Sequence, residues 1–127
     1  MAPVQAICYQ CMPLRYAILH HTGIPSPHYD LMFETAPGSD LATWRVESWP
    51  LDAAQQATRL KDHRRAYLQF EGELTQRRGY VERVAQGTCS IEIGENARWR
   101  VTILSGGAMQ TLILTPNADG QWRVNLE

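Results

Sequence analysis

The residues best suited to chemistry in this chain stand in one short segment, between His21 and Glu34. From His28 onward this segment alternates between two kinds of residue. The alternation predicts a β-strand, because successive side chains of a strand point to opposite faces. One set is apolar and suits a hydrophobic core: Tyr29, Leu31 and Phe33. The other set carries an imidazole and two carboxylates, which are costly to bury unless they are solvated or used: His28, Asp30, Met32 and Glu34.

His28 and Asp30 are two residues apart on the same predicted face, so both could ligate one metal ion. His21 precedes a turn rich in glycine and proline and is near enough in sequence to return as a third ligand. A His/His/carboxylate set with open positions suits Zn²⁺, Mn²⁺ or Fe²⁺. The alternative is an edge strand that shows polar groups to solvent, where His28 and Asp30 merely share a hydrogen bond.

The elements that must position these residues are short strands separated by turn signals made of Gly, Pro, Asn and Ser. Strands are predicted over residues 15–20, 28–35, 41–46, 66–70, 80–84, 88–93, 98–104, 109–114 and 121–126. One helix is predicted over Leu51–Leu60, which is rich in Ala and Gln and has Asp52 in its first turn. So many strands in so short a chain favour a closed barrel over a sandwich. The predicted fold is mainly β, a single antiparallel β-barrel with one short helix.

The length of 127 residues predicts one domain, here 14–127, preceded by a lead-in over 1–13. A net charge of −1 excludes binding of nucleic acid by bulk electrostatics. The basic residues are nevertheless unusual, because eleven of twelve are Arg and seven of the twelve lie between Arg59 and Arg83. Guanidinium groups match phosphate oxygens in a bidentate manner, so this cluster is a candidate phosphate contact. The alternative is a GC-rich genome that favours Arg codons over Lys codons.

Three cysteines do not make a disulfide framework, and a reduced, cytoplasmic setting is expected. Neither a signal peptide nor an apolar stretch of membrane-spanning length is recognisable in the sequence. Cys8 and Cys11 form a lone CxxC pair without a second pair at zinc-site spacing. We interpret this pair as a feature of the tail, with a metal or redox role as the alternative.

Several segments, taken in order, resemble the 3′-phosphoesterase domain of bacterial DNA ligase D. They cover about residues 14–93 and read RYAILHH, HYDLMFE, LATWRV, DHRRAYLQFEGEL, RRGYVERV and QGTCSI. The family signature, His-x(5)-His-aromatic-Asp, corresponds here to His21-x(6)-His28-Tyr29-Asp30, with one extra residue in the proline-rich turn. The chain looks like a small stand-alone relative of that domain.

The resemblance implies a compact β-barrel that trims DNA 3′ ends bearing a ribonucleotide or a phosphate during repair. It implies a divalent metal cofactor, Mn²⁺ first, with Zn²⁺ or Co²⁺ as alternatives. By this resemblance, the family's metal ligands correspond to His21, His28 and Asp30. At the position of His20 the family usually has a glutamate, so His20 is not expected to be a ligand. Two residues match family positions that engage the scissile phosphate, and a third matches a recurrent acid of the site: His63, Tyr67 and Glu34.

Four arginines are further candidates for phosphate or nucleic-acid binding: Arg45, Arg65, Arg77 and Arg78. If the segment around His63 is extended, then His63, Arg65 and Tyr67 share a face and could present two donors and a guanidinium to one anion. The alternative places Tyr67 in the barrel wall and His63 in a loop.

The chain departs from the family at Met32, where active members have an arginine that contacts the phosphate. A thioether cannot offer a charged fork; Arg45 on the neighbouring strand is a candidate substitute. Two hypotheses follow. The first is a metal-dependent phosphoesterase acting on nucleic-acid 3′ ends, favoured by the His/His/Asp set. The second is a non-catalytic barrel that binds nucleic-acid ends or a repair protein, favoured by Met32. Because ligase and polymerase modules are not recognisable, separate repair proteins are the expected partners; no membrane partner is expected.

Overall fold

The computed structural model describes residues 13–127, and this part of the chain is almost entirely β-structure. Nine strands and two short 3₁₀ helices follow one another along it. They are β1 (Leu14–Thr22), β2 (His28–Glu34), β3 (Leu41–Val46), β4 (Gln55–His63), η1 (Arg65–Leu68), β5 (Gly72–Glu73), β6 (Tyr80–Ile93), η2 (Glu95–Ala97), β7 (Trp99–Ser105), β8 (Ala108–Pro116) and β9 (Trp122–Leu126).

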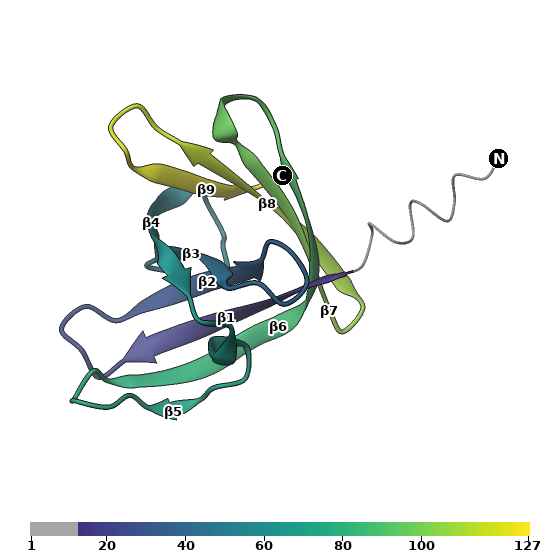
Figure 1. The fold of residues 1–127 in the computed structure, drawn as a ribbon. Helices are drawn as coiled ribbons and strands as arrows, with labels where there is room; N and C mark the ends of the chain where they lie inside the picture. The colour runs from purple at the N-terminus through teal and green to yellow at the C-terminus, as the bar shows by residue number, and fades with distance from the viewer. Residues whose placement is uncertain (1–12) are drawn as a thin grey trace.

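Eight of these strands close into an antiparallel barrel in the order β1-β2-β3-β4-β9-β8-β7-β6, because β6 pairs back with β1. The two-residue strand β5 pairs with β6 outside this ring. Figure 1 shows the long β6, whose first part runs beside β1 and whose last part runs beside β7. The predicted single antiparallel barrel is therefore confirmed. Closure leaves few open edges for pairing with other chains.

The barrel interior is filled by side chains from alternate positions of the strands. Leu31 and Phe33 of β2 point into it, as the alternation predicts. The ring of Phe33 lies 6.0 Å from that of Trp44 and 6.4 Å from that of Tyr16, measured between centroids. These large buried side chains fix the register of β2, because a slip by one residue would turn the apolar set outward.

The outer face of β2 is buried as well, which the sequence pattern did not predict. Met32 lies in a second apolar cluster with Leu68 of η1. The remaining buried members of this cluster are Ala17, Leu19, Leu41 and Val81. Figure 1 shows η1 in front of β1 and β6. The polar residues of β2 therefore do not lie on an exposed edge strand, since β2 pairs with both β1 and β3 and its outer face is covered.

The helix predicted over Leu51–Leu60 is wrong, because most of this segment belongs to β4, between β3 and β9. Ala57 is buried in the core, and the guanidinium of Arg59 stacks over the Trp44 ring at 4.4 Å from its centroid. Both contacts require a period of two along the chain. Helix propensities of ordinary residues differ by at most about 0.7 kcal/mol per residue. The cation–π contact contributes about 0.5–2 kcal/mol. Together with the burial of Ala57, it outweighs the helix propensity of the segment.

Two other predicted boundaries differ from the structure. Residues 66–70, predicted as a strand, include most of η1, which turns Leu68 toward the second apolar cluster. The strands predicted separately over 80–84 and 88–93 form one continuous strand, β6, so no turn interrupts them at Gly87. Gly87 is needed there because a Cβ at this position would lie 2.0 Å from the carbonyl oxygen of Leu104, so glycine allows β7 to pass close by.

Cys89 is a free thiol in the core, and burial raises its pKa to about 12. A thiol of this kind carries almost no thiolate at neutral pH and is chemically inert. The Cys8 and Cys11 pair, together with residues 1–12 of the predicted lead-in, lies outside the described residues.

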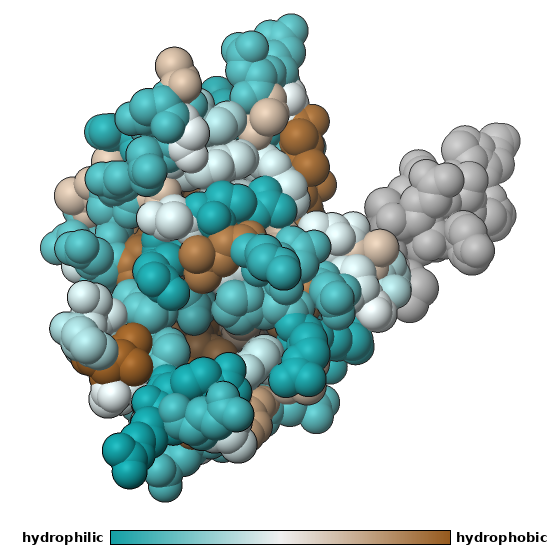
Figure 2. All heavy atoms as spheres, turned by 60° about the vertical axis from the view of Figure 1, so that its left-hand side comes forward, coloured by the Kyte–Doolittle hydropathy of each residue, from teal (hydrophilic) through white to brown (hydrophobic). Residues whose placement is uncertain are grey.

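The surface in Figure 2 is mostly hydrophilic, with apolar residues in separate spots. Exposed apolar side chains such as Met109 and Ile93 are normal for a protein of this size when they are scattered. Within residues 13–127 there is no helix long and apolar enough to cross a membrane.

Candidate metal centre

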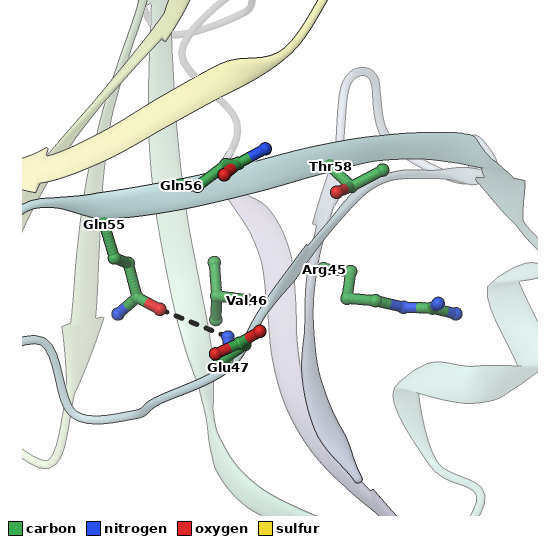
Figure 3. A pocket seen from close by; sticks show the side chains of 6 residues that line it. All are labelled: Arg45, Val46, Glu47, Gln55, Gln56 and Thr58. Carbon is green, nitrogen blue, oxygen red and sulfur yellow. Dashed lines mark hydrogen bonds between the residues drawn. The ribbon is translucent and has the colours of Figure 1, made fainter. Parts of the chain in front are cut away.

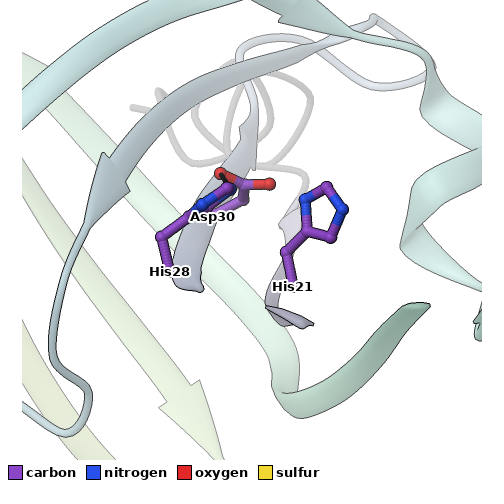
Figure 4. Close-up of side chains that lie close together, drawn as sticks. All are labelled: His21, His28 and Asp30. Carbon is purple, nitrogen blue, oxygen red and sulfur yellow. Dashed lines mark ion pairs between the residues drawn. The ribbon is translucent and has the colours of Figure 1, made fainter. Parts of the chain in front are cut away.

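The structure brings His21, His28 and Asp30 together on the outer wall of the barrel. His21 stands directly opposite His28 in the antiparallel pairing of β1 with β2, and Asp30 follows on the same face of β2. One ligand atom from each residue lies within 4.8 Å of the other two. Figure 4 shows the three side chains, with His28 and Asp30 from one strand and His21 from the next. This spacing suits three ligands of a single ion, and a divalent metal would be held with further positions open.

Two of these ligand atoms are buried without a hydrogen-bond partner among the described residues. They are Nε2 of His28 and Oδ1 of Asp30, which lie 3.5 Å apart. His28 is only 4% exposed and Asp30 only 5%. The two atoms would form an ion pair with each other if His28 were protonated, but burial lowers the pKa of His28 and favours the neutral ring. Buried polar atoms are nearly always paired, so an unpaired nitrogen and an unpaired carboxylate oxygen that face one another require an explanation. A cation between them supplies it, and the residues present therefore fit a metal.

The orientation of the His28 ring leaves the correct nitrogen available. Its Nδ1 lies 3.0 Å from the carbonyl oxygen of Ser26, so Nδ1 carries the hydrogen and donates it. Nε2 then keeps its lone pair and points toward Asp30, which is the usual arrangement of a metal-binding histidine. Burial lowers the pKa of His28 below its ordinary value of 6.5, which favours the neutral ring that a metal requires.

His21 is oriented in the same way by a different carbonyl. Its Nε2 lies 2.7 Å from the carbonyl oxygen of Arg78 and donates to it, which leaves Nδ1 as the ligand atom. Gly79 makes this contact sterically feasible, because it has a φ of +93° and a Cβ there would lie 2.3 Å from the carbonyl oxygen of Thr22. His20, by contrast, stacks on Tyr29 with 4.3 Å between ring centroids and is not part of the cluster.

His63 reaches the edge of this cluster through an irregularity of β4. The pairing of β3 with β4 shifts register between Leu41 and Thr43, so that His63 stands opposite Leu41 and shares its outward face. Bulges of this kind re-aim a side chain. The Nδ1 of His63 donates to the carbonyl oxygen of Lys61 at 3.1 Å, and its Nε2 lies 3.9 Å from Oδ2 of Asp30.

The prediction that His63, Arg65 and Tyr67 share the face of an extended segment is wrong, because residues 65–68 form η1. Tyr67 nevertheless stays next to His63, with 5.7 Å between the ring centroids. Arg65 forms an ion pair with the buried carboxylate of Glu34. The guanidinium of Arg65 is therefore already occupied.

Glu34 ties three parts of the chain together. Its Oε1 accepts a hydrogen bond from the backbone N–H of Arg15 at 2.7 Å, and its Oε2 accepts one from Gly38 at 3.1 Å. With the Arg65 ion pair, these contacts fasten the start of β1, the turn after β2, and η1. The side chain is 3% exposed, and it is not one of the three residues whose ligand atoms converge.

The other candidate arginines differ in where they lie. Arg45 stands directly opposite Asp30 in the pairing of β2 with β3, so its side chain is on the same face. It also lines a groove of about 290 Å³ beside β4, in which its side chain extends away from Gln55 (Figure 3). Arg77 is exposed in the turn before β6. Arg78 contributes its carbonyl to His21, and its guanidinium donates hydrogen bonds to Thr75.

Met32 is fully buried in the second apolar cluster. No part of its side chain reaches the surface where a phosphate could bind. The strand pairing places Arg45 opposite Asp30, one of the candidate metal ligands.

The supporting carbonyls of Ser26, Arg78 and Lys61 were missed by sequence reasoning. A carbonyl group is present at every residue, so no sequence signal could have selected these three. Gly79 did carry a signal, because Arg78-Gly79 reads as a turn, but its close approach to His21 became visible only in the fold.

Comparison of the chain with protein-family models finds no match, and comparison with curated protein sequences finds none either. The likeness to the ligase D 3′-phosphoesterase domain thus rests on the segments and signature residues described above. The fold and site together define a closed antiparallel β-barrel with a His/His/Asp candidate metal centre on its outer wall.

Proposed function

We propose that this protein is a divalent-metal-dependent 3′-phosphoesterase that trims 3′-ribonucleotide or 3′-phosphate ends of nucleic acid in DNA repair. Mn²⁺ is the expected cofactor, with Zn²⁺ or Co²⁺ as alternatives. The observation that carries the proposal is the convergence of His21, His28 and Asp30, with both rings fixed by backbone carbonyls and a buried nitrogen and oxygen left unpaired.

Each residue of the site has a chemical role in this proposal. A divalent ion, when bound, would polarise a phosphoryl oxygen and stabilise developing negative charge. His21, His28 and Asp30 would hold that ion. His63 would contact the phosphate through Nε2 or, when protonated, donate a proton to the leaving oxygen. Tyr67 would donate a hydrogen bond to the phosphate from its hydroxyl group.

Arg45 supports the choice of a phosphate as the reacting group. It lies across the strand pair from Asp30, on the face that carries the candidate ligands. A guanidinium beside a metal can clamp phosphate oxygens and share the neutralisation of their charge. Separate ligase or polymerase proteins would supply the remaining steps of repair.

A second candidate function is favoured by one observation. Met32 replaces the arginine of the active family and is sealed inside an apolar cluster. A barrel that keeps the metal and binds nucleic-acid ends or a repair protein, without hydrolysis, is consistent with that replacement.

The test uses the full chain with Mn²⁺ and labelled primer-templates that end in a ribonucleotide or a 3′-phosphate. We expect trimming to a 3′-hydroxyl in the wild type and its loss in His63→Ala, with thermal stability almost unchanged. His20→Ala is the matched control, since that ring lies outside the cluster, and it should retain full activity. If Mn²⁺ binds but neither end is trimmed, the second candidate stands, and end binding measured by fluorescence anisotropy should then be lost in Arg45→Ala.

A further inference from the structure

A second groove, of about 230 Å³, lies between η1 and the hairpin of β5 and β6. Aromatic rings form part of its lining, because Tyr67 and Phe70 meet edge to face with 5.9 Å between centroids. Phe70 is 36% exposed, so one part of its ring is open to a ligand. Three charged residues also line the groove: Arg64, Glu73 and Arg78.

Two residues that line this groove also contact residues of the candidate metal centre or its edge. Tyr67 lines the groove and lies next to His63, whose Nε2 is 3.9 Å from Asp30. Arg78 lines the groove and provides the carbonyl that orients His21. A phosphate held at the centre would therefore have its attached nucleoside within reach of the groove.

We propose that this groove binds the unpaired base of the nucleotide at the strand end, with guanine preferred; this rests on the proposed function of the neighbouring site. Drug-sized ligands occupy pockets of roughly 300–1,000 Å³. The smaller groove suits one planar base rather than a base pair. Aromatic side chains stack on any base, because each base has a π-face. Phe70 is the exposed ring available for that contact.

The preference for guanine comes from Glu73. An ionised carboxylate only accepts hydrogen bonds, and it has two oxygens side by side. Guanine presents two neighbouring donors on its Watson–Crick edge, N1–H and N2–H, which match the two oxygens. Adenine and cytosine each present a single amino donor on that edge, so they can satisfy only one oxygen. Arg64 and Arg78, which also line the groove, favour the negatively charged backbone.

The experiment measures binding of 5′-labelled single-stranded DNA hexamers by fluorescence anisotropy, using the full chain with Mn²⁺ present. The hexamers carry a 3′-hydroxyl, so they cannot be trimmed, and differ only in the terminal residue: guanine, hypoxanthine, adenine or an abasic site. We expect guanine to bind about tenfold more tightly than adenine, with hypoxanthine, which lacks the N2 amino group, in between. Glu73→Gln should abolish the ratio. Phe70→Ala should weaken all three bases about tenfold and leave the abasic hexamer unchanged.

The matched control is Glu95→Gln, which changes an exposed carboxylate in η2, beyond the end of β6, and should bind all four hexamers as the wild type does. Equal binding of the guanine and abasic hexamers, or no binding of any, overturns the proposal, as does a guanine preference that survives Glu73→Gln. A failure of the proposed function gives a different result: 3′-phosphate ends remain untrimmed, whatever the base preference in binding. If guanine and abasic ends are trimmed equally, the base-binding groove is rejected and the phosphoesterase activity stands.

Discussion

Nε2 of His28 and Oδ1 of Asp30 lie 3.5 Å apart, and within residues 13–127 neither atom has a hydrogen-bond partner. Leaving such a buried group unsatisfied costs about 1–3 kcal/mol. Two ligands that are each about 2.1 Å from one ion can stand up to about 4 Å apart. The separation thus suits two ligands of one metal.

Gly79→Ala should loosen the candidate centre without touching a ligand. The left-handed backbone and the contact with the Thr22 carbonyl force the turn away from His21, which then loses its hydrogen bond to the Arg78 carbonyl. We expect a loss of about 1–3 kcal/mol in the free energy of unfolding and a tenfold to hundredfold weaker affinity for Mn²⁺. Urea unfolding and a metal titration measure the two effects. An unchanged metal affinity in a folded variant would show that this carbonyl does not orient the ligand.

Glu34→Ala should reduce stability while leaving metal binding intact. The variant removes the carboxylate that holds Arg15, Gly38 and Arg65, and a hydrogen bond to a charged group contributes about 1.5–3 kcal/mol. Because Arg65 is partly exposed and can return to solvent, we expect a net loss of about 2–3 kcal/mol in urea unfolding. A variant that stays fully stable but no longer trims 3′ ends would instead place Glu34 in the chemistry, as the family resemblance implies.

The stability of the metal-free protein should fall as the pH drops below 6.5. Burial lowers the pKa of His28 in the folded protein below the ordinary value of 6.5, which applies to the unfolded chain. Between the folded and the unfolded pKa, the unfolded chain therefore binds more protons than the folded protein. The free energy of unfolding rises with pH through this interval, and the contribution of His28 reaches its full size above it. Urea unfolding between pH 5 and 7 in EDTA measures the slope. His28→Gln should flatten it, and an equal slope in both proteins would assign the effect to other groups.

The sequence predicted the structure correctly where a local pattern of apolar and polar residues decides it. The alternation from His28 to Phe33 predicted β2, its core face and the shared outer face of His28 and Asp30. The helix over Leu51–Leu60 was wrong because Ala and Gln favour helices only weakly, whereas Arg59 has three tryptophan rings to stack on once the barrel has formed. That cluster comes from strands far apart in sequence, so local propensity could not reveal it.

Long-range geometry also explains why the site was only partly predictable. His63 joins the cluster because β4 contains a bulge, and Tyr67 lies beside it because η1 folds back onto β1. Neither feature has a clear signature in the residues themselves. Arg65 was assigned to phosphate on its charge and on an extended segment, whereas residues 65–68 form η1 and Arg65 pairs with Glu34.

The central claim is that His21, His28 and Asp30 bind one divalent ion, and a Mn²⁺ titration followed by calorimetry tests it most directly. The titration uses the chain with Cys8→Ser and Cys11→Ser, so that no tail thiol contributes, and compares His28→Ala with the matched control His20→Ala. We predict one ion per chain, an affinity at least about a hundredfold weaker in His28→Ala, and no change in His20→Ala. At a Mn²⁺ concentration of 100 times Kd, the bound ion should also stabilise the parent protein by about 2.7 kcal/mol. Mn²⁺ affinity that is unchanged in His28→Ala, or a parent protein that binds no ion, would contradict the account.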